Sequence, residues 1–289
     1  MYKNISSLKK NAIKDVDIAI KEDLGSGDIT TNLLGKDKSK LSSAIVRSNE
    51  DAILCGQIWF ESAFRNIQKK YGGILKIKWL KKDGEKVKKG QIICKINAPL
   101  RTILVSERTA LNFLQFLSGI STKTQLYKKK LNNKKIQILD TRKTIPGLRY
   151  CQKYAVACGG GKNHRFGLYD QVLIKENHIN QKSCKYEDFL NNIQKKIGFR
   201  KLSIEVETLS ELRTLIKYKP KNILLDNFKI PNIKKAIQII NKKNTTIEIS
   251  GNININNIQN YKSLNIDYIS IGDLTKNIKS IDLSMLVEK

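Results

Sequence analysis

Six short apolar runs, each followed by an amphipathic stretch, constrain the fold of this chain more than any other feature of its sequence. They lie between residues 136 and 273, and each ends in polar or small residues. Apolar runs of about four to eight residues are typical of strands buried on both faces, as in a parallel sheet covered by helices. The runs are IQILDTRK, DQVLIKEN, LSIEVET, NILLDNF, TTIEISGN and DYISIGD.

This alternation is compatible with a βα-barrel or with an open doubly wound sheet. The last four runs are closely and evenly spaced, and no G-x-G-x-x-G motif follows a run. Because a dinucleotide-binding sheet normally carries that motif after its first strand, the barrel is favoured. We therefore predict an α/β fold with a TIM-like βα-barrel, complete or partial, over residues 106–275. Its first helix is expected over Glu107–Leu117.

The first hundred residues have a different rhythm and predict a separate α+β sandwich domain over residues 1–105. Apolar residues at helical spacing indicate a first helix that ends near the turn-rich segment Leu24–Asp28, and a further helix is expected over Trp59–Lys70. The tail at 276–289 is expected to pack back on this domain. Strands are expected in SSAIVRS, DAILCG, ILKIKWL and QIICKINA.

The formal net charge of +28 raises the question of a polyanionic partner. Of the 54 cations, 45 are Lys and nine are Arg, and the Lys residues are scattered along a chain that also holds 41 Ile. That joint excess is typical of A/T-rich codon usage, and the chain lacks both a basic stripe and an aromatic RNP-like motif. We expect no nucleic-acid partner, and RNA binding without catalysis is the alternative from another class of protein.

Neither a membrane span nor a disulfide framework is indicated. No apolar run approaches the roughly 20 residues that cross a bilayer, and the N-terminus lacks the apolar region of a secretory signal. The cysteines are odd in number and never spaced C-x-x-C, so their pattern does not indicate a zinc cluster either. We interpret Cys151 and Cys158 as packing residues. A cytoplasmic location is expected. The cysteines are Cys55, Cys94, Cys151, Cys158 and Cys184.

Charged or small residues stand at the end of each apolar run. In a βα-barrel the carboxyl ends of all strands meet at one mouth, where active sites lie. A single polar residue at a strand end is explained by solvent, but six in succession favour a site. Cations and carboxylates in one pocket suit an anionic, phosphorylated substrate with a metal ion. The residues are Arg142 and Lys143, Lys175, Glu205 and Glu207, Asp226, Ser250 and Gly251, and Gly272.

The loop after the first run adds a glycine triplet, Gly159–Gly161, followed by His164 and Arg165. Glycines let the backbone approach a ligand and present N–H donors to an anion, although a flexible turn is the alternative. We favour a site role for His164 because of its neighbours. His178 stays open between a site residue and a turn residue.

Several long blocks closely resemble the quinolinate phosphoribosyltransferase family, also called the carboxylating nicotinate-nucleotide pyrophosphorylases. The resemblance covers nearly the whole chain in the right order and is weakest over residues 36–100. The blocks are EDLGSGDITT, SERTALNFLQFLSGIST, LDTRKTIPGLR, KYAVACGGGKNHRFGLYDQVLIKENHI, EVETLSEL, LLDNF, EISGNI and DYISIGDLT.

The resemblance implies a homodimeric enzyme of de novo NAD biosynthesis. Such enzymes join quinolinate to 5-phosphoribosyl-1-pyrophosphate (PRPP) with Mg²⁺, release pyrophosphate and CO₂, and yield nicotinate mononucleotide. A related enzyme of the same fold that accepts another acid, or that serves molybdate metabolism, is the nearest alternative. The TRK, HR and Lys175 set favours quinolinate.

The resemblance also implies roles for single residues. Arg108 would reach quinolinate from the neighbouring subunit, and Thr141 is also implied to be a substrate-binding residue. The groups implied to grip the two carboxylates are Arg142, His164 and Arg165, and those implied to lie near the carboxylate and the pyrophosphate are Lys143 and Lys175.

The remaining implied roles concern the ribose, the metal and the 5-phosphate. Glu205 and Asp226 would face the ribose and, indirectly, the Mg²⁺, and together with the two lysines they are the expected catalytic residues. The turns implied to hold the 5-phosphate are Ser250-Gly251-Asn252 and Ser270-Ile271-Gly272.

Overall fold

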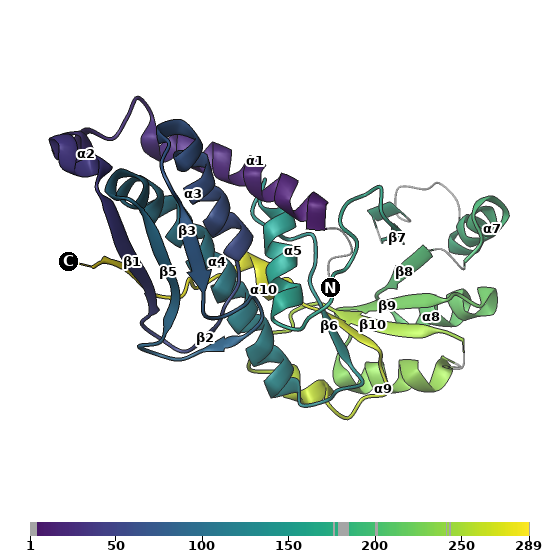
Figure 1. Ribbon diagram of the computed structural model, residues 1–289. Helices are drawn as coiled ribbons and strands as arrows, with labels where there is room; N and C mark the ends of the chain where they lie inside the picture. The colour runs from purple at the N-terminus through teal and green to yellow at the C-terminus, as the bar shows by residue number, and fades with distance from the viewer. Residues whose placement is uncertain are drawn as a thin grey trace. The chain divides into compact units, whose positions relative to one another are not determined.

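The computed structural model divides the chain into two compact units, whose elements are shown in Figure 1. It describes residues 5–175, 177–178, 185–199, 202–240, 242 and 244–288. The first unit comprises Met1–Gln125, Thr144–Gly160 and Leu274–Lys289, and the second comprises Leu126–Lys143 and Gly161–Asp273.

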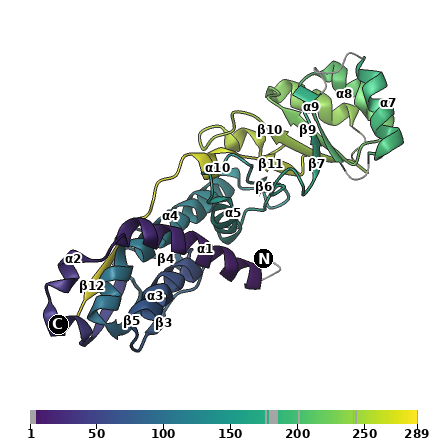
Figure 2. The same cartoon turned by 90° about the horizontal axis from the view of Figure 1, so that it is seen from above.

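The first unit is built on an antiparallel sheet with strand order β12-β1-β5-β3, beside which β2 and β4 form a separate pair. The C-terminal strand belongs to this sheet, since Ala44 lies opposite Val287, and it is the yellow strand among the blue ones in Figure 2. The strands are β1 (Leu41–Ser48), β2 (Ala52–Ile53), β3 (Lys76–Trp79), β4 (Lys86–Val87), β5 (Ile92–Pro99) and β12 (Leu283–Val287).

The helices of this unit are α1 (Ile5–Leu24), α2 (Ile29–Asn32), the 3₁₀ helix η1 (Gly35–Ser39), α3 (Gln57–Tyr71), most of α4 (Leu100–Leu131) and α5 (Arg149–Cys158). Helix α3 links the sheet to α1. The Phe60 ring lies 5.2 Å from the ring of Trp79 on β3, and the Trp59 indole donates a 2.9 Å hydrogen bond to Asp15 on α1. Both predicted N-terminal helices are confirmed.

Helix α4 is much longer than the predicted stretch 107–117. Its buried apolar positions continue through Ile120, Tyr127 and Leu131, so the helical period does not end at Leu117. Gly119 resembles a helix stop in the sequence, but its role is close packing. A Cβ at this position would lie 2.2 Å from the carbonyl oxygen of Lys279.

The second unit is a six-stranded parallel sheet with order β6-β11-β10-β9-β8-β7. Every predicted apolar run forms one strand, and the α/β class with a TIM-like sheet is confirmed. Within the described residues β6 and β7 each pair with one neighbour, so the barrel is partial there. The strands are β6 (Gln137–Leu139), β7 (Val172–Ile174), β8 (Leu202–Val206), β9 (Asn222–Asp226), β10 (Thr246–Ser250) and β11 (Tyr268–Ser270).

Connecting helices separate these strands, as Figure 1 shows for α9 beside β9 and β10. The β8 strand is buried along its whole length, which explains its continuous apolar pattern. The helical segments are α7 (Tyr186–Lys196), α8 (Leu209–Leu215), η2 (Ile216–Tyr218), α9 (Ile230–Ile239), η3 (Ile258–Tyr261) and α10 (Asp273–Lys276). None of the helices in the described part of the chain has the length and apolar character of a membrane span.

Candidate functional site

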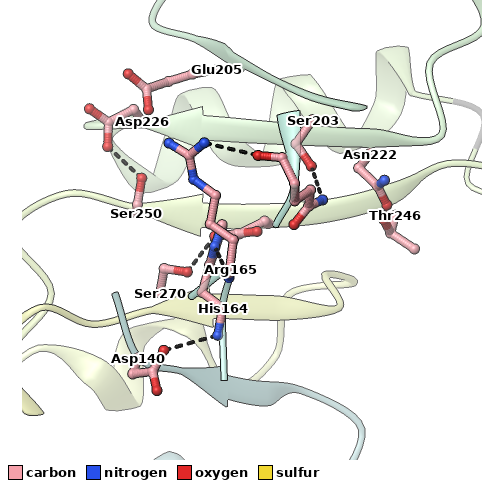
Figure 3. A network of polar contacts seen from close by, with 12 residues as sticks. Asp140, His164, Arg165, Ser203, Glu205, Asn222, Asp226, Thr246, Ser250 and Ser270 are labelled. Atoms are coloured by element: carbon pink, nitrogen blue, oxygen red, sulfur yellow. Dashed lines mark hydrogen bonds and ion pairs between the residues drawn. The ribbon is translucent and has the colours of Figure 1, made fainter. Parts of the chain in front are cut away.

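The segment that carries His164 and Arg165 is fixed beside β6. Lys162 forms a parallel bridge with Leu139, and its N–H donates to the carbonyl of Ile138 at 2.8 Å. The fully buried Asp140 accepts the backbone N–H of His164 at 2.9 Å, as Figure 3 shows. The buried carboxylate therefore sets where this segment enters the carboxyl edge of the sheet.

Both ring nitrogens of His164 contact other groups of the protein. Its Nδ1 accepts the backbone N–H of Arg165 at 2.7 Å, which leaves Nε2 to carry the ring proton. That Nε2 lies 3.3 Å from a carboxylate oxygen of Glu248 on β10, and the same oxygen accepts the hydroxyl of Ser270 on β11. The geometry gives His164 a part in orienting the Arg165 segment.

Arg165 is only 8% exposed and lies close to a second guanidinium. Its Nη1 donates to the carbonyl of Gln171 at 2.9 Å. Burial lowers the pKa of Arg165, the positive charge of Arg142 lowers it further, and Asp170 and Glu205 oppose these effects. Two guanidinium groups thus share a poorly solvated region, where an anion would relieve their repulsion.

Lys175 follows β7 and forms a 2.6 Å ion pair with Glu205 on the adjacent β8. The lysine side chain is 43% exposed and the glutamate side chain 8%, so the carboxylate is held inside and the ammonium faces outward. Because parallel strands end at one edge, residues from separate runs meet here as predicted.

Glu205 also belongs to a group of three carboxylates with Glu207 and Asp226, whose oxygen ligands all lie within 4.8 Å of one another. Asp226 is held by the hydroxyl of Ser250 and by the side-chain amide of Asn227 at 2.8 Å, the former shown in Figure 3. An all-oxygen group of this kind suits a hard divalent cation such as Mg²⁺.

The turns after β10 and β11 have distinct constraints. Gly251 has φ +95°, and a Cβ there would lie 2.1 Å from the Asn227 amide oxygen, so only glycine fits. Asn252 also has positive φ, +49°. The Ile271 N–H donates to the Leu139 carbonyl at 3.0 Å and so belongs to the sheet.

Thr141 and Lys143, after β6, lie over Gly272, after β11. A Cβ on Gly272 would be 3.6 Å from Thr141 Oγ1 and 2.9 Å from Lys143 Cδ. The carboxyl ends of β6 and β11 are therefore in direct contact, and Lys143 joins the same edge as the other predicted residues of this unit.

Three hypotheses drawn from the sequence concern residues that are placed differently from the group at the sheet edge. They concern Arg108, His178 and the first glycine of the triplet. Arg108 lies in the first unit, exposed on α4. The His178 ring accepts the Lys175 backbone N–H at 3.0 Å, which favours the turn interpretation of this histidine. A Cβ on Gly159 would lie 2.4 Å from the Ser121 carbonyl, so packing of the end of α5 on α4 accounts for the first glycine of the triplet.

Glu248 and Asp140 are the buried carboxylates that sequence reasoning missed. Glu248 stands in the middle of the apolar run TIEIS, where a strand normally places a solvent-facing polar residue, and its sequence neighbours carry no sign of its partners. Asp140 was inside the LDTRK block without being singled out. Only its position one residue after a strand could have indicated it.

Family comparison and related structures agree on one family. Residues 120–286 match the C-terminal domain of quinolinate phosphoribosyl transferase, and residues 28–118 match the N-terminal domain. A relative named probable nicotinate-nucleotide pyrophosphorylase [carboxylating] from Methanocaldococcus jannaschii is 40% identical, over 96% of this chain and 98% of its own. A similarly named Bacillus subtilis protein is 36% identical, over 91% and 89%.

Solved structures show the same likeness in three dimensions. The nicotinate-nucleotide pyrophosphorylase of Francisella tularensis superimposes with a TM-score of 0.89 at 38% identity, covering 97% of both chains. The enzyme of the same name from Ehrlichia chaffeensis gives a TM-score of 0.86 at 34% identity over 100% of both chains.

The contact between His164 and Glu248 predicts that the His164 ring holds one tautomer. It also predicts that removing the Glu248 carboxylate lowers the free energy of unfolding. Glu248→Ala removes the acceptor of the Ser270 hydroxyl and the carboxylate beside the buried His164 ring, so we expect a loss of about 1–3 kcal/mol in the free energy of unfolding. Glu248→Gln keeps an acceptor oxygen and should lose less. Urea unfolding measures both variants.

The same contact is visible in the ring nitrogen NMR spectrum, because the chain has only two histidines and His178→Gln assigns them. We expect the Nε2–H tautomer at His164 in the parent protein and in Glu248→Gln. An Nδ1–H tautomer, or equal stabilities for the two Glu248 variants, would contradict the orienting contact.

Proposed function

Because this chain belongs to the quinolinate phosphoribosyltransferase family, we propose that the carboxyl edge of its parallel sheet binds quinolinate and PRPP and joins them. The reaction transfers the phosphoribosyl group to quinolinate with decarboxylation and yields nicotinate mononucleotide for NAD biosynthesis. Pyrophosphate and CO₂ leave. The chain is thus a pentosyltransferase of this pathway.

The proximity of Arg142 and Arg165 is the observation that carries the proposal. Like charges on two neighbouring guanidiniums repel each other, and an anion bound beside both would reduce that repulsion. Quinolinate has two adjacent carboxylates, and planar guanidinium groups bind carboxylates through paired hydrogen bonds. The contact between His164 and Glu248 orients the segment that holds Arg165. Lys175, which forms an ion pair with Glu205, is a third cationic side chain at this edge of the sheet.

The three carboxylates fit the other half of the reaction. Loss of pyrophosphate leaves positive charge on the ribose carbon, which Glu205 or Asp226 can stabilise electrostatically. We propose that Glu205, Glu207 and Asp226 also hold the Mg²⁺ that accompanies PRPP, whose charge would balance the leaving pyrophosphate. Holding the pyridine nitrogen against the ribose carbon supplies much of the remaining acceleration.

Decarboxylation needs no enzyme nucleophile. Once the ring nitrogen is ribosylated it is cationic, and its charge stabilises the electron pair that CO₂ leaves on the adjacent carbon, which then takes a proton from solvent. The groups at the sheet edge have only to orient the ring and to keep the departing carboxylate beside Lys143 or Lys175.

The turns after β10 and β11 are proposed to hold the 5-phosphate. The hydroxyls of Ser250 and Ser270 already donate to Asp226 and Glu248, and the Ile271 N–H to Leu139. The proposal therefore depends on backbone N–H groups of the Gly251-Asn252 turn and on Gly272, where Lys143 adds positive charge.

We further propose a homodimer in which Arg108 reaches the site of the partner subunit. Two features support it. Arg108 is exposed on α4, and large apolar side chains are exposed near α2, with Ile29 80% and Leu33 82% accessible. The free thiols at Cys55, Cys94, Cys151 and Cys158 fit the proposed cytoplasmic location.

The test of the function is formation of nicotinate mononucleotide from quinolinate and PRPP with Mg²⁺, followed by chromatography and by release of labelled CO₂. We expect product only when all three are present. Turnover of a different acid in place of quinolinate would favour the related-enzyme alternative, and absence of product from a folded protein would refute the proposal.

Arg142→Lys keeps the charge but removes the two-pronged contact. Loss of one charge-assisted hydrogen bond predicts a fall in kcat/KM for quinolinate of about tenfold to a hundredfold. Arg213→Lys, at an exposed position on α8, is the matched control and should behave as the parent. Equal kinetics for the two variants would exclude the proposed role of Arg142.

Subunit mixing tests the shared site. Arg108→Ala and Lys175→Ala should each be inactive, and random exchange should return about a quarter of the parental activity, since half of the dimers then hold one intact site. Arg142→Ala mixed with Lys175→Ala is the control that should stay inactive, because both residues belong to the second unit. No recovery after verified exchange would argue against a site completed by Arg108.

A further inference from the structure

A second cluster of metal-ligating side chains lies in the first unit, separate from the residues of the proposed reaction. Cys55 precedes α3, Asp83 lies in the turn between β3 and β4, and Cys158 ends α5. One ligand atom from each residue lies within 4.8 Å of the other two. The cluster brings together residues up to 103 positions apart, which explains why spacing gave no sign of it.

Hydrogen bonds hold Cys55 and the Asp83 turn in place. The Ser118 hydroxyl on α4 contacts both backbone groups of Cys55, at 2.9 Å from its N–H and 3.2 Å from its carbonyl. The Gly84 N–H donates to the Leu54 carbonyl at 2.8 Å, which ties the Asp83 turn to the Cys55 segment. A preformed arrangement lowers the entropy cost of binding an ion.

Among the described residues, the hydrogen-bond partners of the Asp83 carboxylate are neutral. Its Oδ1 accepts the N–H groups of Gly56 and Gln57 at 3.0 and 3.3 Å, and its Oδ2 accepts the Tyr154 hydroxyl at 2.9 Å. None of the ion pairs among the described residues involves Asp83. Burial raises the pKa of this carboxyl to about 6. Neutral donors do not cancel the negative charge of the ionised Asp83 carboxylate. A cation beside the two thiols would compensate that charge.

We propose that Cys55, Asp83 and Cys158 form a binding site for a thiophilic divalent cation of the Zn²⁺ class. Two sulfur ligands select such an ion over Mg²⁺. Sulfurs bound to one tetrahedral Zn²⁺ lie about 3.8 Å apart, which is compatible with ligand atoms that all lie within 4.8 Å of one another. As the two metal–sulfur bonds form, each thiol releases its proton to water. Cys158 is partly exposed, which gives the ion access and leaves a position for solvent.

The experiment uses the full chain, stripped of metal with a chelator and kept under a phosphine reductant. Co²⁺ is the probe, because sulfur-to-cobalt charge transfer gives near-ultraviolet absorption that oxygen ligands do not give. Co²⁺ at the three carboxylates of the sheet edge is therefore silent at these wavelengths. All variants carry Cys184→Ser, since Cys184 lies outside the described residues.

We expect one Co²⁺ per chain with this absorption, displacement by Zn²⁺, and a rise in melting temperature with Zn²⁺ that Mg²⁺ does not produce. Cys55→Ser and Cys158→Ser should each weaken Co²⁺ binding by at least about a hundredfold, and Asp83→Asn by less. Cys94→Ser, a buried cysteine on β5 of the same unit, is the matched control and should bind as the parent.

Circular dichroism confirms that each variant is folded. Absence of charge-transfer absorption in the folded, reduced parent would overturn the site. Absorption that survives in both Cys55→Ser and Cys158→Ser would also overturn it, because it would show an adventitious ion only. Neither readout uses quinolinate turnover, so failure of this site leaves the proposed reaction untouched, and failure of the reaction leaves the site untouched.

Discussion

The parallel hydrogen-bond ladder of the second unit is the constraint on which the site depends. The hydrogen bonds between neighbouring strands fix their register, so that Ser250 on β10 lies opposite Asp226 on β9. All six parallel strands therefore end at the same edge of the sheet. Residues as distant in sequence as Lys143 and Gly272 meet only because β6 and β11 are neighbours in this ladder. Side chains supplied by separate loops therefore meet at this edge without a further device.

The charges at this edge are only partly balanced by ion pairs within the protein. Lys175 has its own carboxylate in Glu205, whereas Arg165 faces Arg142 and has its pKa lowered by burial and by that neighbour. Asp170 and Glu205 offset part of this effect on Arg165. A ligand with two carboxylates, bound as proposed, would add to this compensation.

The sequence predicted the strands better than the interior contacts between them. All six apolar runs form strands because burial on both faces leaves a strong pattern. Helix α4 extends past the predicted stretch because its buried apolar positions continue to Leu131. Glu248 could not be found, since its partners His164 and Ser270 belong to other segments and a glutamate in a strand usually faces water. The resemblance supplied the residue roles, and the ring contacts of His164 came from the structure alone.

The two candidate ion sites of this chain differ in ligand chemistry, and that difference has a functional consequence. The sheet edge offers three carboxylates, which suit Mg²⁺, while the Cys55 cluster offers two sulfurs and one carboxylate. A thiophilic ion binds oxygen ligands too, and at the sheet edge it would compete with the Mg²⁺ that accompanies PRPP. Sulfur ligands in the first unit hold such an ion more tightly than carboxylates do. If both proposals hold, occupancy of the Cys55 cluster at low zinc concentration leaves the reaction dependent on Mg²⁺ alone.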